Sequence, residues 1–314
     1  MSRMMRAVRA GKGVVEMAVP SPEPGQVLVR TRAFGVNRPE LLQHEGGYPV
    51  RPDQTDVLGL ELAGVAEQSG EEVCALVGGG AYAEYCITDE RLTLPIPFQG
   101  DDRFVRAAAL PETTFTVWKN LFWDGPDTLK GKSVFVQAGA SGIGTTAIAM
   151  AKAFGASRVT TTARDDERCK FCTDVVGADV CYNYNTEEWE KEEKADVILD
   201  MVGGSYLPRH LKMMQQGARL VILGFLGSPV TEKLNMTRVL LKNLTITGSV
   251  LRSAPDSEKA RICEELKRHV WPRLASGEIA LPHISHTFEG IDAYADAFED
   301  MNNSKHKGKM VLRL

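Results

Sequence analysis

The stretch SVFVQAGASGIGTTAIAMAKAFGASRVTTTAR, residues 133–164, limits the possible folds more than any other part of the chain. It opens with an apolar run, 133–138, that predicts a buried parallel strand. A glycine turn follows, and the apolar residues after it recur at helical spacing until Gly155 ends the helix. The β-branched run 158–163 predicts a second strand. Strand, turn, helix and strand together predict one βαβ unit.

The glycine turn of this unit predicts nucleotide binding. Its pattern G-x-S-G-I-G departs from the dinucleotide fingerprint G-x-G-x-x-G, because Ser141 takes the middle glycine position. Glycines allow a tight turn beside a diphosphate, and the N–H groups and dipole of a helix start favour an anion. An ordinary glycine turn is the alternative, but the flanking strand and helix favour a nucleotide. We therefore expect the cofactor to contact the turn residues Gly139, Ser141, Gly142, Ile143 and Gly144.

Four charged residues follow the second strand, where dinucleotide-binding folds distinguish NAD from NADP: Arg164, Asp165, Asp166 and Arg168. An acid there hydrogen-bonds the 2′-hydroxyl of NAD, whereas an arginine accommodates the 2′-phosphate of NADP. Arg164 comes first, and a guanidinium matches a phosphate bidentately, which favours NADPH. A solvated charged turn is the alternative for at least two of these four residues.

Composition and charge narrow the function classes. The chain has 314 residues, 43% of them hydrophobic, which predicts two domains with filled cores. Its formal net charge of −4 gives no basic footprint and argues against a nucleic-acid partner. Six scattered cysteines fit reduced thiols and a cytoplasmic location. The single C-x-x-C, Cys169 and Cys172, favours buried or half-buried helix positions over a redox or zinc role. No apolar run is long enough for a membrane span.

The first 110 residues and the 140 that follow differ in the periodicity of their apolar residues. Residues 1–110 carry short strands with glycine bends, which predicts a small antiparallel barrel. Residues 111–250 alternate strands with helices, which predicts an α/β, doubly wound parallel sheet. An amphipathic helix capped by Asp256 is expected over 256–275, and a closing strand over 309–314. The expected domains are 1–112 with 251–314, discontinuous, and 113–250. Further strands are expected at 26–33, 58–65, 178–182, 197–201, 219–224 and 244–249.

Several motifs together resemble one enzyme family. They run nearly from end to end and are GVNRPELLQHEGGY (35–48), LGLELAGV (58–65), GGGAYAEY (78–85), LPETTFTVW (110–118), AGASGIGTTAI (138–148), ILDMVGGSY (198–206) and GKMVL (308–312). They resemble the zinc-independent quinone oxidoreductase group of the medium-chain dehydrogenases/reductases. Ser141 in the middle glycine position resembles the p53-inducible branch of that group.

The resemblance implies a GroES-like β-barrel domain and a Rossmann domain with NADPH in the cleft between them. It implies hydride transfer to a quinone or a similar electron-poor acceptor. It also implies a homodimer paired through the edge of the Rossmann sheet. The segment 66–73 is shorter than the family's usual one, which indicates a trimmed barrel loop.

The acceptor side is expected to work without a metal. Asn37 takes the place of the first zinc cysteine of zinc-dependent relatives, no four-cysteine lobe is present, and His44 is isolated. Hydrogen-bond donors must then meet the charge that develops on the acceptor. Tyr48 is the expected donor, with a tyrosine that only packs beside the nicotinamide as the alternative. By resemblance Asn37 faces the nicotinamide, or forms a local turn hydrogen bond, and Ser141 takes part in catalysis.

The remaining cofactor contacts are expected after later strands. Tyr184 matches a family position near the 2′-phosphate, with a loop aromatic as the alternative. A strand ends at Leu223, Gly224 and Phe225, which are expected to touch the nicotinamide half. Lys309 is expected either to reach a cofactor phosphate or to cap the closing strand.

Two glutamates and two arginines complete the candidate residues. Glu61 and Glu112 lie in apolar settings where a carboxylate needs a partner, so we expect structural ion pairs. Arg38 and Arg51 would suit a coenzyme A ester, which favours the alternative of a 2-enoyl-thioester or enone reductase. A nucleotide-binding protein with little turnover is the alternative from another class.

Overall fold

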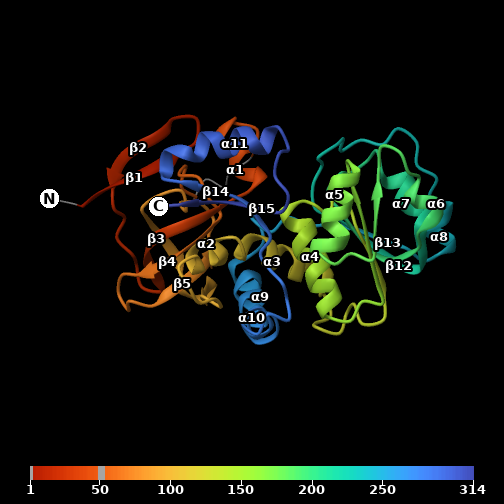
Figure 1. Ribbon diagram of the computed structural model, residues 1–314, viewed down its shortest axis with the longest axis horizontal. Coiled ribbons are helices and arrows are strands. Elements are labelled where there is room, and N and C mark those ends of the chain that lie inside the picture. Colours follow the sequence, from red (N-terminus) through yellow and green to blue (C-terminus); the bar gives the residue numbers. More distant parts are fainter. Residues whose placement is uncertain (1–2, 49–53) are drawn as a thin grey trace. The chain divides into compact units, whose positions relative to one another are not determined.

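A computed structural model describes residues 3–48 and 54–314, and the chain in it divides into two units (Figure 1). The first unit comprises Met1–Phe115, Arg252–Gly277 and Leu281–Leu314, and the second comprises Thr116–Leu251 and Glu278–Ala280. The expected domain ranges stay a prediction, because a division by packing is not a test of independent folding.

The second unit is built on a six-stranded parallel sheet in the order β10-β9-β8-β11-β12-β13. This order is the one typical of dinucleotide-binding sheets, so the prediction of a doubly wound parallel sheet is confirmed. The strands are β8 (Ser133–Val136), β9 (Arg158–Ala163), β10 (Val180–Asn183), β11 (Ala195–Asp200), β12 (Met214–Ile222) and β13 (Thr245–Gly248).

Helices cover both faces of this sheet. Figure 1 shows α4 and α5 on one side of it and α6 and α7 on the other. Their bounds are α4 Gly142–Ala153, α5 Asp166–Lys170, α6 Trp189–Glu192, α7 Leu207–Met213 and, near the β13 edge, α8 Thr237–Leu241. Helix α4 buries Ala147, Ile148 and Ala151 against the sheet, as the helical spacing predicts. Gly155 follows the C-cap with φ +81°, which confirms it as the residue that ends the helix.

The first unit is built on a seven-stranded sheet in the order β14-β15-β3-β4-β5-β7, with β6 also paired to β3. The strand pairs within residues 1–110 are all antiparallel, which confirms the antiparallel pairing expected there. Of the two later strands, β15 pairs antiparallel with β3, and β14 pairs parallel with β15. The strands are β3 (Gln26–Val36), β4 (Glu61–Ala66), β5 (Glu72–Leu76), β6 (Tyr85–Asp89), β7 (Thr93–Pro95), β14 (Ile284–Glu289) and β15 (Lys309–Arg313). A separate hairpin joins β1 (Met4–Arg9) to β2 (Gly13–Ala18).

Helices complete the first unit and correct one expectation. The stretch 256–275 forms two helices, α9 (Asp256–His269) and α10 (Trp271–Ala275). The break lies beside Pro272, which lacks an N–H donor and cannot continue the preceding helix. Asp256 is the first helical residue rather than the cap, and Pro255 at the cap position offers no side-chain hydrogen bond. The other helices of this unit are α1 (Arg38–His44), α2 (Arg103–Ala108) and α11 (Tyr294–Asn302), and the division between the units falls within α3 (Pro111–Leu121).

Over the residues that the structure describes, none of the helices is long and apolar enough to cross a membrane.

Candidate functional site

The glycine turn between β8 and α4 is closed by its own serine. Ser141 is the N-cap of α4, and its Oγ accepts the N–H of Gly144 at 3.0 Å. The same hydroxyl donates to the carbonyl of Ala138 at 2.8 Å. Among the described residues, no backbone or side-chain group accepts a hydrogen bond from the N–H groups of Gly142 and Ile143. Two donors at the start of a helix are therefore open to an anion such as a diphosphate.

Two glycines of the turn are required by space. A Cβ at Gly144 would lie 2.3 Å from the carbonyl oxygen of Ala138, and a Cβ at Gly139 would lie 2.2 Å from Oγ1 of Thr161. Thr161 is itself held, because its hydroxyl donates to the carbonyl of Val136 at 2.6 Å. The helix therefore packs on the strand as closely as dinucleotide-binding folds require, and the turn fits a nicotinamide dinucleotide.

The carboxylate of Asp165, the first acid after β9, is already bonded to other residues of the chain. Asp165 is the N-cap of α5 and accepts the N–H of Arg168 at 2.8 Å. Its carboxylate also meets the guanidinium of Arg168 at 3.1 Å and Nε of Arg164 at 3.2 Å. Burial alone would raise the pKa of Asp165, but the hydrogen bonds from Arg168 and Arg164 lower it overall. Arg164 is part-exposed, whereas Arg168 is buried, so a solvated turn is the wrong description of Arg168.

The other expected cofactor residues of the second unit follow its parallel strands. Tyr184 comes directly after β10, is half-buried and packs against the core of the unit. Leu223 follows β12, and its N–H donates to the carbonyl of Asp200 at 2.8 Å. Phe225 is 54% exposed. Because the carboxyl ends of parallel strands share one edge of a sheet, these residues, the glycine turn and Arg164 belong to one edge.

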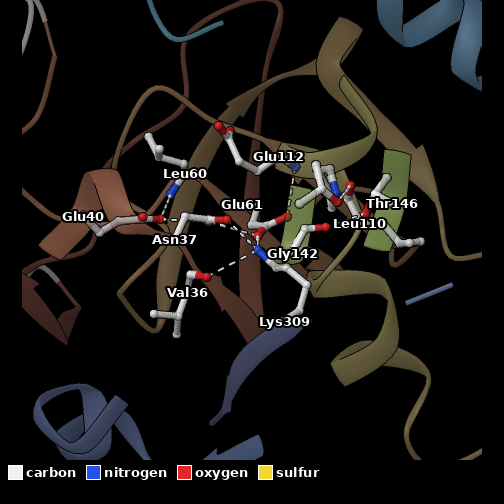
Figure 2. A network of polar contacts seen from close by, with 12 residues as sticks. Val36, Asn37, Glu40, Leu60, Glu61, Leu110, Glu112, Gly142, Thr146 and Lys309 are labelled. Carbon is white, nitrogen blue, oxygen red and sulfur yellow. Dashed lines mark hydrogen bonds and ion pairs between the residues drawn. The ribbon is translucent and has the colours of Figure 1, made fainter. Parts of the chain in front are cut away.

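A buried network of charges occupies the first unit (Figure 2). The ammonium of Lys309 lies 2.5 Å from Oε1 of Glu61, and the two side chains are 3% and 0% exposed. It also donates to the side-chain oxygen of Asn37 and to the carbonyl of Val36. The expected ion pair of Glu61 is confirmed. Since these contacts use all three N–H donors of Lys309, the ammonium has no donor left for a cofactor phosphate.

Asn37 is an internal link of this network. Its amide nitrogen donates to Oε1 of Glu40 at 3.2 Å and to Oε1 of Glu61 at 3.0 Å (Figure 2). Its oxygen accepts from Lys309. Both N–H groups of the amide are thus committed, which favours a structural role over the expected contact with the nicotinamide.

Two further carboxyl groups of the network lack a cation of their own. Oε1 of Glu40 accepts the N–H of Leu60 at 3.2 Å, whereas Oε2 is buried and has no partner among the described residues. Burial raises the pKa of Glu40 to about 7. Glu112 gives its backbone N–H to Glu61, but its side chain forms no ion pair in the described part of the chain. Burial, together with Glu61 and Glu40, raises the pKa of Glu112 to about 8. The ion pair expected for Glu112 is therefore wrong, and sequence reasoning missed Glu40.

The raised pKa of Glu40 predicts how the stability of the fold changes with pH. Between its ordinary value of 4.5 and about 7, the folded state keeps a proton that the unfolded chain has released. The free energy of unfolding therefore falls as pH rises through this window, by about 3 kcal/mol in total. In Glu40→Gln this contribution is absent, so urea unfolding at pH 5 and pH 8 should show a smaller pH-dependent loss. The exposed Glu299→Gln is the control, and an equal pH dependence in wild type and Glu40→Gln would contradict the prediction.

The ring of Tyr48 lies beside the buried guanidinium of Arg252. The guanidinium of Arg252 lies 5.4 Å from the centre of the Tyr48 ring. It donates to Oε1 of Gln43 and to the carbonyl of Gly78, each at 2.9 Å. Burial raises the pKa of Tyr48, and Arg252 offsets part of that rise. The phenol therefore keeps its proton at neutral pH and can serve as a donor.

The remaining candidate residues of the first unit are three arginines and a histidine. Arg252 was missed, because nothing in its local sequence distinguishes it from a surface arginine. Arg51 lies outside the described residues, and Arg38 is half-buried at the start of α1. His44 packs its ring edge-on against Tyr294. Over residues 3–48 and 54–314 no three His, Cys, Asp or Glu side chains are grouped as a metal ion requires. Independence from zinc stays a prediction.

Comparison with known proteins finds a matching domain family for part of each unit. The sequence profile of the alcohol dehydrogenase GroES-like domain matches residues 23–98, and that of the zinc-binding dehydrogenases matches 142–267. The quinone oxidoreductase of Lama guanicoe is 29% identical over 99% of this chain and 98% of its own length. Prostaglandin reductase-3 of Mus musculus is 25% identical over 94% of this chain and 83% of its own length. The solved quinone oxidoreductase of Thermus thermophilus, also studied with NADPH, is 28% identical and superposes with a TM-score of 0.82 over 100% of both chains.

Proposed function

We propose that this chain, which belongs to the quinone oxidoreductase group of the medium-chain dehydrogenase/reductase family, is an NADPH-dependent quinone reductase. It would pass a hydride to a quinone or a similarly electron-poor acceptor without zinc. One observation carries the proposal: the turn at α4 leaves two N–H groups open, while the first acid after β9 is held by its own helix. This combination favours a bound dinucleotide with a 2′-phosphate over one with a free 2′-hydroxyl.

The residues of the chain have distinct parts in this function. The N–H groups of Gly142 and Ile143 would bind the diphosphate, and Arg164 would bind the 2′-phosphate. Bound NADPH supplies the hydride. Tyr48 would donate a hydrogen bond or proton to the acceptor oxygen on which negative charge develops. Ser141 shapes the turn with its hydroxyl, so we propose a positioning role for it instead of a catalytic one.

The substrate class is tested by following oxidation of NADPH and NADH with several acceptors. The acceptors are para-benzoquinone, an ortho-quinone and crotonyl-CoA. Turnover of a quinone with preference for NADPH would support the proposal. Turnover of crotonyl-CoA alone would assign the chain to the enoyl-thioester reductases. Tight NADPH binding without turnover of any acceptor would indicate a nucleotide-binding protein.

The choice of cofactor is tested by Arg164→Gln. Loss of one charge-assisted contact with the 2′-phosphate is expected to weaken NADPH binding about tenfold or more and to leave NADH binding unchanged. Fluorescence titration with each nucleotide gives the two affinities. Arg91→Gln, which alters an exposed arginine of the first unit paired with Asp89, is the matched control. Equal losses for NADPH and NADH would contradict the assignment.

We also propose a homodimer through the β13 edge of the parallel sheet. Strand β13 ends the sheet and has one strand partner among the described residues. Large apolar side chains on α8 and directly after β13 are exposed: Leu240 by 76%, Leu241 by 70% and Val250 by 55%. Exposed apolar groups beside an open strand edge are typical of a protein interface. Sedimentation velocity tests this, and a monomer at micromolar concentration would exclude it.

A further inference from the structure

Three cysteines of the second unit converge where α5 meets β10. Cys169 lies on α5, Cys172 lies one turn later in a π-helical segment (η2, Phe171–Val175), and Cys181 lies on β10. All are reduced. The Sγ atoms of Cys169 and Cys181 are 3.0 Å apart, although the residues are twelve positions apart in the sequence. The three remaining cysteines, Cys74, Cys86 and Cys263, are buried in the first unit.

We propose that Cys169 and Cys181 form a modification site for hydroperoxides, which close the pair into a reversible disulfide that weakens NADPH binding. The part concerning NADPH rests on the proposed function. The Cys169 thiolate would attack the peroxide O–O bond, giving a sulfenic acid and one molecule of water or alcohol. The sulfur of Cys181 would then displace the hydroxyl, giving the disulfide and a second water. Two thiols lose two electrons and two protons, and the hydroperoxide takes up both.

The geometry favours this pair over the other cysteines. A disulfide needs about 2.05 Å between its sulfur atoms, so the two Sγ atoms must approach by only about one ångström. Both thiols are half-buried, which gives an oxidant access that Cys172 and the cysteines of the first unit lack. Burial raises the pKa of Cys169, and contact with Cys172 together with burial raises the pKa of Cys181. The pair therefore rests mostly as thiols, and the species that reacts with peroxide is the small thiolate fraction of Cys169.

The disulfide would act on residues already assigned to the cofactor. Cys169 is the neighbour of Arg168, whose N–H and guanidinium hold Asp165. Cys181 lies two residues before Asn183, which donates to Asp166 on α5 at 2.7 Å. Drawing the two sulfur atoms together shifts α5 against β10. We expect this shift to disturb the cluster of Arg164, Asp165 and Arg168.

The modification itself is tested by peptide mapping of the whole protein. Purified protein is treated with hydrogen peroxide, its remaining thiols are alkylated, and its peptides are analysed by mass spectrometry. The expected product joins Cys169 to Cys181 and disappears after dithiothreitol. It should be absent in Cys181→Ser and in Cys181→Ala, and present in Cys263→Ser. Absence of a linked peptide from the wild type, or a link between Cys172 and Cys181, would overturn the proposal.

The effect on the cofactor is tested by NADPH titration before and after peroxide. Oxidised wild type should bind NADPH about fivefold more weakly or worse, with recovery after dithiothreitol. Cys181→Ser should not respond to peroxide. A linked peptide with unchanged NADPH affinity would overturn the regulatory half. If the reduced protein fails to bind NADPH at all, the proposed function fails, whereas the peptide map still decides the modification site.

Discussion

Replacement of Lys309 by methionine is expected to lower the free energy of unfolding by about 3–5 kcal/mol. The substitution keeps the length of the side chain but removes the only cation within ion-pair distance of Glu61 in the described part of the chain. Glu61 is 0% exposed, so its carboxylate would be left buried without a counter-charge. Asn37 would lose the donor to its side-chain oxygen at the same time. Urea unfolding followed by tryptophan fluorescence measures the loss.

This test has an exposed lysine as its control and a double variant as its second measurement. Lys305 pairs with Asp300 at 3.0 Å, but its side chain is 55% exposed. Lys305→Met should therefore cost no more than about 1 kcal/mol. Adding Glu61→Gln to Lys309→Met should recover part of the loss, because no buried charge remains. Similar losses in the two lysine variants, or no recovery in the double variant, would show that the buried pair does not stabilise the fold.

Tyr48→Phe is expected to lower kcat with a quinone about a hundredfold and to leave NADPH affinity unchanged. The phenol is half-buried beside the guanidinium of Arg252 and keeps its proton, so it can donate where charge develops on the acceptor. Phenylalanine keeps the ring and its packing but removes the donor. Initial rates of quinone reduction, with a separate NADPH titration, measure the two effects.

The control for this substitution is another half-buried tyrosine of the first unit. Tyr294→Phe removes a hydroxyl from a ring that packs against Phe298 and has no assigned role in the reaction. It should leave kcat within about a factor of two, since surface and peripheral changes have small effects. If Tyr48→Phe keeps full activity, Tyr48 only packs in the site and another group must supply the proton.

The parallel sheet and the glycine turn were predictable because their signals are local. Residues 133–163 carry the apolar strand, the glycines and the helical period in one continuous stretch, and the observed β8, α4 and β9 lie within it. The role of Ser141 was harder to predict. A serine before a helix is a recognised cap. Because Ser141 also stands at a glycine position of the dinucleotide fingerprint, the sequence suggested a contact with the cofactor instead.

The network of the first unit was less predictable because its contacts are long-range. Glu61 meets Lys309 from 248 positions away, and Arg252 meets Gln43 from 209 positions away. No periodicity or spacing in a single sequence marks such partners. Glu40 was missed for a related reason, since a glutamate in the first turn of α1 has the pattern of an ordinary exposed helix residue.

The position of β15 has a consequence for how the chain is made. This strand pairs with β3 and β14 inside the sheet of the first unit, and it brings in the ammonium that neutralises Glu61. During synthesis from the N-terminus, β3 and β4 leave the ribosome long before β15 exists. All strands of the parallel sheet are complete by Gly248, so this sheet can assemble first. Until the last strand arrives, the nascent first unit carries an open strand edge and an uncompensated carboxylate, which makes it the segment most in need of chaperone protection.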